Sequence, residues 1–102
     1  MSILHTVNKS PFEKNSLESC LRVAGDSSAV LLLEDGVLGA LDQTRIASQV
    51  KANLGRIRFY VLEPDLRARG LDPARVIHGI TSVNYDGFVD LAVEHDKIQA
   101  WL

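Results

Sequence analysis

The sequence predicts an α/β protein in three layers (α/β/α), with a mostly parallel sheet of about five strands, flavodoxin-like in outline. Two observations predict it. Short apolar runs alternate with helix-like segments along the chain, a pattern typical of parallel strands joined by right-handed crossovers. The run at residues 29–33 is apolar at every position, which indicates a strand covered on both faces. We therefore expect one domain over residues 1–102, with this run near the centre of its sheet.

The first strand and the first helix are predicted from apolar spacing and helix-end signals. Residues 3–7 form the strand. The helix begins at Asn15 or Ser16, either of which can cap it, and Gly25 follows its last turn. Its inward stripe has apolar residues at i, i+4 and i+7, namely Leu17, Leu21 and Ala24.

The second strand and the second helix are joined by a turn. Residues 28–34 form the strand, and Asp35-Gly36 supplies the turn that leaves it. The second helix is expected to run to about Leu54, where Gly55 ends it. Apolar residues recur at every fourth position in its last half, at Ile46, Val50 and Leu54.

The rest of the chain continues the alternation. Residues 57–62 form the third strand, and a short helix begins at Pro64, which suits a first helical position, and ends at Gly70. A short strand, a last helix and a terminal strand are then expected at residues 80–83, 84–95 and 98–102. The last helix has one apolar face, made of Phe88, Leu91, Ala92 and His95.

Composition and charge exclude several classes of function. The net charge is −2 and the isoelectric point about 5.8, with no basic block that could neutralise a phosphate backbone, so we expect no direct nucleic-acid partner. The longest fully apolar run, residues 29–33, is far shorter than the ~20 residues of a membrane helix. No secretory signal is recognised at the start. We therefore expect a cytoplasmic protein without a membrane partner.

Functional residues of such a sheet are expected in the loops after the strands. Glycine-rich phosphate-binding patterns are absent from these loops. The pair Glu34-Asp35 could bind a metal or act as acid and base, although a simple turn explains it as well. The histidines, His5, His78 and His95, lack the spacing of metal ligands. We therefore expect neither a metal nor a cofactor.

Cys20 is the only cysteine, which excludes an internal disulfide. A thiolate with a lowered pKa can carry sulfur as a persulfide. Cys20 is expected at the edge of the inward stripe of the first helix, a turn inside it, where the helix dipole activates it only weakly. Two interpretations stay open: a partly buried, unreactive cysteine, or a sulfur-handling residue. Trp101, with Tyr85 and Phe88, could likewise anchor an interface or pack in the core.

Several short pieces, found in order over nearly the whole chain, resemble the DsrH/TusB family of sulfur-relay proteins. They are Leu4-His5-Thr6, Lys9-Ser10-Pro11-Phe12, Leu31-Leu32-Leu33-Glu34-Asp35-Gly36-Val37, Tyr60-Val61-Leu62, Asp65-Leu66, Ala68-Arg69-Gly70-Leu71, Tyr85, Phe88-Val89 and Ala100-Trp101. Residues 1–13 and Cys20 resemble the DsrH branch of sulfur-oxidising bacteria more than the TusB branch of tRNA thiolation.

The resemblance implies a DsrE/F-like fold and a place in a cytoplasmic DsrEFH hetero-hexamer with DsrE-type and DsrF-type subunits, active in dissimilatory sulfur oxidation. It also implies that the main persulfide cysteine lies on the DsrE-type subunit and that a DsrC- or TusE-type protein accepts the sulfur. This chain would then be a non-catalytic or auxiliary subunit of a sulfurtransferase complex, with Cys20 a candidate secondary persulfide site.

Two alternatives remain. The same scaffold could be a TusB-like subunit for 2-thiolation of the wobble uridine of tRNA. It could also be a free-standing domain that binds a small molecule around Asp35, which predicts a stable monomer with a pocket at the strand ends.

Overall fold

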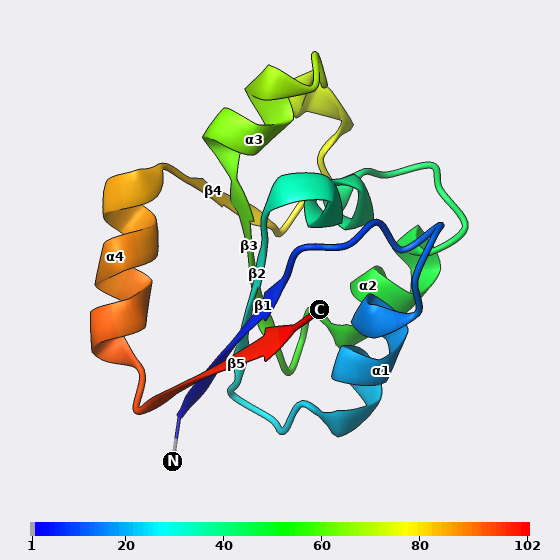
Figure 1. The fold of residues 1–102 in the computed structure, drawn as a ribbon. Coiled ribbons are helices and arrows are strands. Elements are labelled where there is room, and N and C mark those ends of the chain that lie inside the picture. The colour runs from blue at the N-terminus through cyan, green and yellow to red at the C-terminus, as the bar shows by residue number, and fades with distance from the viewer. Residues whose placement is uncertain (1) are drawn as a thin grey trace.

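Five parallel strands form the central sheet of the computed structural model, which describes residues 2–102 (Figure 1). Across the sheet their order is β4-β3-β2-β1-β5, and every neighbouring pair is parallel. The predicted fold class is confirmed. The order itself, which the sequence did not predict, differs from the 2-1-3-4-5 order of flavodoxin. The strands are β1 (Ile3–Val7), β2 (Ala29–Leu32), β3 (Arg58–Leu62), β4 (Thr81–Val83) and β5 (Lys97–Trp101).

The strand order decides which face each helix covers. The first crossovers all step in one direction across the sheet, so right-handed connections place α1 (Ser16–Val23) and α2 (Ala47–Asn53) on the same face. The step from β4 to β5 runs the other way, and α4 (Tyr85–Glu94) therefore lies alone on the opposite face (Figure 1). The short helix α3 (Glu63–Ala68) follows β3 directly.

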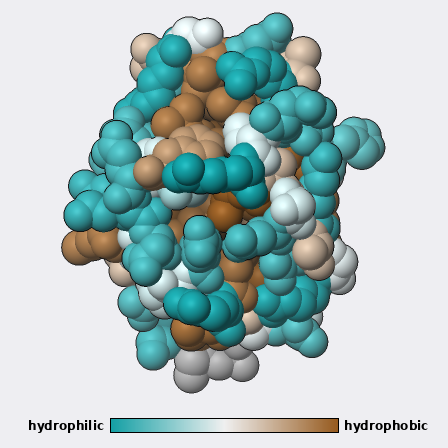
Figure 2. Space-filling view, turned by 90° about the vertical axis from the view of Figure 1, so that its right-hand side faces the viewer, coloured by the Kyte–Doolittle hydropathy of each residue, from teal (hydrophilic) through white to brown (hydrophobic). Residues whose placement is uncertain are grey.

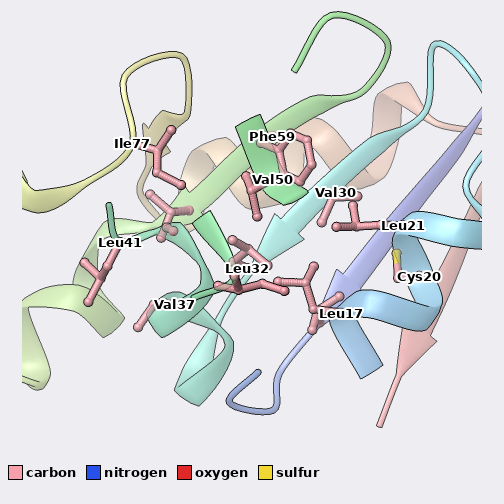
Figure 3. Close-up of a cluster of buried hydrophobic side chains, with 14 of the residues drawn as sticks. Leu17, Cys20, Leu21, Val30, Leu32, Val37, Leu41, Val50, Phe59 and Ile77 are labelled. Atoms are coloured by element: carbon pink, nitrogen blue, oxygen red, sulfur yellow. The ribbon is translucent and has the colours of Figure 1, made fainter. Parts of the chain in front are cut away.

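Strand β2 lies in the middle of the core, as its uniform apolarity predicts. All four of its residues are buried. Val30 and Leu32 belong to the larger core cluster, which includes α1 and α2 (Figure 3). Ala29 and Leu31 belong to the smaller cluster, on which Leu91 of α4 packs. Alternate side chains of this strand therefore enter cores on both faces of the sheet.

The prediction of one continuous second helix that ends near Leu54 is wrong over the middle of that segment. In its place a 3₁₀ helix, η1 (Glu34–Ala40), is followed by an irregular segment and then by α2. Leu41 forms an isolated bridge with Val76, and the Asp42 N–H donates to the carbonyl of Arg75 at 2.7 Å. Gln43 adopts a φ of 63°, outside the helical region. These contacts with a distant segment, near the 3₁₀ helix η2 (Pro73–Arg75), draw the backbone out of the helix.

The ends of the shorter helices follow the predicted signals with one exception. Pro64 lies in the first turn of α3, and Gly70 follows with a φ of 66°, the left-handed conformation that glycine adopts freely. Asn15 is the N-cap of α1, but its side chain makes no capping hydrogen bond. The hydroxyl of Ser16 instead donates to the carbonyl of Leu102 at 3.2 Å, which ties α1 to the end of the chain.

Candidate functional site

The loops at the carboxyl ends of β1, β2 and β3 are joined by hydrogen bonds, as the parallel topology predicts. The Asn8 amide donates to the Glu34 carboxylate at 3.2 Å. The backbone N–H of Glu34 donates in turn to the Asp65 carboxylate at 2.6 Å. Glu34 holds a φ of 51°, which a residue with a side chain rarely adopts. Asp65 therefore helps to hold a strained turn, and this is a structural role.

The Glu34-Asp35 pair is also occupied by contacts within the protein. The Asp35 carboxylate accepts a hydrogen bond from Nε of Arg69 at 3.0 Å. At Gly36 the backbone passes so close to β1 that a Cβ would overlap the carbonyl oxygen of Val7. The two carboxylates thus tie loops together, and nothing in their contacts arranges them as an acid–base pair. Within residues 2–102, no three His, Cys, Asp or Glu side chains are grouped to hold a metal ion.

The three histidines lie in separate places. His5 is buried in β1, and His78 is exposed in the segment before β4. His95 is the C-cap of α4, on the other side of the sheet, where its Nδ1 lies 2.7 Å from the carbonyl oxygen of Leu91. Its Nε2 lies 3.3 Å from the guanidinium of Arg58. Each histidine therefore has its own surroundings, and they form no common site.

Cys20 is completely buried, deeper than the predicted edge position. Its sulfur lies inside the larger core cluster, between α1 and the sheet, beside Leu17 and Leu21 (Figure 3). Burial raises the pKa of the thiol from its ordinary value of 9.0 to about 12, because the low-dielectric interior disfavours the thiolate. At neutral pH Cys20 is a thiol without access to solvent. Its role as a sulfur carrier stays a prediction, and it would require α1 to move.

His5 and Trp101 form a polar contact between the two strands at the edge of the sheet. Nε1 of Trp101 donates to Nδ1 of His5 at 3.1 Å, and the ring centroids are 6.2 Å apart. The proton of the neutral imidazole is then on Nε2, which has no hydrogen-bond partner in the described part of the chain. Desolvation lowers the pKa of His5, so the ring is neutral at pH 7. Trp101 therefore packs against the core, one of the two interpretations of its sequence.

A cavity of about 290 Å³ lies beside this contact. It is lined by Ile3, His5, Val23, Gly25, Gln99 and Trp101, and so lies on the α1 side of β1 and β5. Figure 2 shows that face of the molecule, where apolar surface runs in a broken strip between polar side chains. The small-molecule alternative predicted a pocket around Asp35, and Asp35 is not among the residues that line this cavity.

The outer face of α4 is a feature that the sequence argument missed. Phe88 and Leu91 face the sheet, as predicted. Yet Tyr85, Val89 and Val93 form a second apolar stripe, and 59%, 60% and 80% of their surfaces are exposed. Their spacing at i, i+4 and i+8 is visible in the sequence, and it could have been recognised as a second helix face.

The site and the fold together define a small parallel α/β protein whose strand-end loops are tied to one another and whose thiol is buried. The family model described as "DsrH like protein" matches residues 9–98. The chain therefore belongs to the DsrH/TusB family. In residues 2–102, no helix is long and apolar enough to cross a membrane.

Relatives agree with this family, and solved structures agree with the fold. The chain is 35% identical over 99 residues to Protein TusB of Pectobacterium parmentieri, an alignment that covers 97% of this chain and all of the relative. With Protein TusB of Erwinia tasmaniensis the identity is 41% over 100 residues, with the same coverage. Among solved structures, the ychN protein from E. coli has a TM-score of 0.87 at 16% identity and covers 98% of both chains. MTH1491 from Methanobacterium thermoautotrophicum has a TM-score of 0.75 at 20% identity, over 96% of both chains.

Proposed function

We propose that this chain is an auxiliary, non-catalytic subunit of a cytoplasmic hetero-oligomeric sulfur-relay complex that serves 2-thiolation of the wobble uridine of tRNA. Relatives named TusB, aligned over 97% of the chain, support this pathway. These relatives favour tRNA thiolation, which the sequence left as an alternative, over dissimilatory sulfur oxidation, which was the first interpretation.

The observation that carries the auxiliary role is the burial of Cys20. A relay cysteine must present a thiolate to both a sulfur donor and an acceptor. Cys20 has no exposed surface, and burial raises its pKa to about 12. In this proposal the persulfide is carried by a DsrE-type (TusD-type) partner and a DsrC- or TusE-type protein receives the sulfur, as the family resemblance implies. This chain contributes surface for assembly.

The net charge of −2 also fits a subunit that does not bind tRNA itself. A phosphate backbone is held by clustered Lys and Arg, and the positive charges of this chain are scattered along it. Several of them are paired within the protein, as Arg69 is with Asp35 and Lys51 with Asp42. The tRNA is then contacted by other proteins of the pathway.

Sulfur oxidation is the second candidate, and a sequence observation favours it. Residues 1–13 and Cys20 resemble the DsrH branch, and the matching family model carries the DsrH name. The two pathways use the same kind of subunit. They differ in the fate of the sulfur, which can be measured directly.

The test is deletion of the gene in its own bacterium, followed by mass spectrometry of 2-thiouridine in total tRNA. We expect the modified base to be lost and to be restored by both the native chain and a Cys20→Ser variant. Unchanged 2-thiouridine in the deletion strain would exclude the thiolation pathway, and slower oxidation of stored sulfur in that strain would then favour the second candidate. Failure of Cys20→Ser to restore the base, with the variant protein present at native levels, would show that Cys20 is required and would refute the auxiliary role.

A further inference from the structure

We propose that the outer face of α4 docks another subunit of the relay complex, one that presents an apolar surface edged by Lys and Arg. This inference rests on the proposed function, because it takes the partner to be a sister subunit. The surface consists of the apolar stripe Tyr85, Val89 and Val93 and of an acidic row beside it, Asp86, Asp90 and Glu94.

The apolar stripe has no role in the core of this chain. Helix α4 already packs on the sheet through Phe88 and Leu91. The outward face of such a helix is normally polar, but Tyr85, Val89 and Val93 occupy the neighbouring outward positions with more than half of their surfaces exposed. Tyrosine is enriched in the centres of interfaces, and two exposed valines extend the apolar surface along the helix from Tyr85.

The same side of the sheet is incompletely covered. Parallel sheets are usually buried on both faces, but α4 is the only helix on this face within residues 2–102 (Figure 1). Ile98 of the edge strand β5 pairs with Leu4, a residue of the α4-side cluster, and it is 52% exposed. A partner that covers α4 would therefore find further apolar surface at this edge of the sheet.

The acidic row indicates the charge of the partner. Asp86, Asp90 and Glu94 succeed one another at i, i+4 and i+8, and α4 contains no Lys or Arg. Like charges at this spacing destabilise a helix. No ion pair in the described part of the chain neutralises these three side chains. Lys or Arg around an apolar patch on the partner would relieve this repulsion.

The same charges argue against a second copy of this chain as the occupant. A two-fold contact brings identical surfaces together. Packing α4 against α4 would place two acidic rows beside each other with no basic residue from either helix. A different subunit with positive charge is the occupant that the surface fits.

The experiment measures binding of the full chain to its co-expressed DsrE-type and DsrF-type subunits by surface plasmon resonance. Val93→Asp and Asp90→Lys are the test variants. Val23→Asp is the matched control, since Val23 is 68% exposed on α1, on the opposite face of the sheet. We expect Kd to rise at least tenfold for both test variants and to change less than twofold for the control.

Two further measurements keep the test decisive. Circular dichroism reports whether a variant is folded, and Asp90→Lys is expected to stay folded because it removes repulsion within α4. The native Kd should also rise with added salt, which screens the charge contact. Native-like binding by the folded variants would overturn the α4 surface and leave the proposed function intact. Failure of the native chain to bind any sister subunit would instead refute the proposed function. A native homodimer that Val93→Asp dissociates would overturn the choice of partner.

Discussion

Raising the pH should destabilise the native chain more than a Cys20→Ala variant, because the buried thiol resists ionisation. In the unfolded chain the thiol loses its proton near pH 9.0, whereas in the folded chain it keeps the proton to about pH 12. Between these values the folded state binds one proton more than the unfolded state. The free energy of unfolding therefore falls as the pH rises through this window.

The size of the effect follows from the pKa difference. One pH unit corresponds to about 1.4 kcal/mol per proton. From pH 7 to pH 10.5 the thiol should therefore lower the free energy of unfolding of the native chain by about 2 kcal/mol, about four-fifths of it above pH 9. The Cys20→Ala variant loses packing as well, but that loss is the same at every pH. The free energy of unfolding changes with pH at a different slope in each protein, and the difference between the two slopes is the contribution of the thiol.

The assay is urea unfolding of both proteins at pH 7, 8, 9, 10 and 10.5 under reducing conditions. We expect the difference in the free energy of unfolding between the two proteins to narrow steadily above pH 9. Parallel curves would refute the reasoning, because they would show that the thiol ionises equally in the folded and the unfolded chain. Rapid reaction of the folded native chain with a thiol reagent at pH 8 would contradict it independently.

Three further predictions concern the fold around the site. Gly36→Ala should lower the free energy of unfolding by about 3 kcal/mol or more, since its Cβ would overlap the Val7 carbonyl oxygen. The Cβ of Gly55→Ala meets nothing within 4 Å, so this variant should instead stabilise the chain by about 0.4–1 kcal/mol. Urea unfolding compares the two variants. Trp101→Phe removes the hydrogen bond to His5 and should lower the free energy of unfolding by about 1–3 kcal/mol. A loss near zero would show that water replaces the missing hydrogen bond. Burial lowers the pKa of His5 below 6.5, so the free energy of unfolding should fall as the pH drops below that value. A His5→Leu variant should lose less stability over the same pH range, and equal losses in the two proteins would contradict the lowered pKa.

Much of the fold could be predicted because its signals are local. The all-apolar run at residues 29–33 identified the central strand, and Pro64 and Gly70 marked the ends of α3. The second helix could not be predicted correctly, because the bonds of Leu41 and Asp42 that break it come from residues more than 30 positions away. Spacing alone shows no such partner.

The candidate site also has features that the sequence predicted and features that only the structure shows. Parallel topology correctly placed the loops of Asn8, Glu34 and Asp65 at one edge of the sheet. Whether their carboxylates were free or already paired depended on side-chain contacts between loops, which local sequence does not specify. The apolar stripe on α4 was present in the sequence as a spacing, but the structure was needed to show which of the two apolar faces packs on the sheet.

By itself the sequence determined the α/β class, the central strand and the family, because these depend on the periodicity of apolar residues and on short pieces that follow one another in the order expected of the family. Only the tertiary structure decided the strand order, the isolation of α4 on one face and the burial of Cys20. The physical reason is that solvent exposure is set by everything that packs around a side chain. A cysteine at the edge of a helix stripe is exposed or buried according to its neighbours, and here α1 packs against both β1 and β5, which encloses the thiol and raises its pKa.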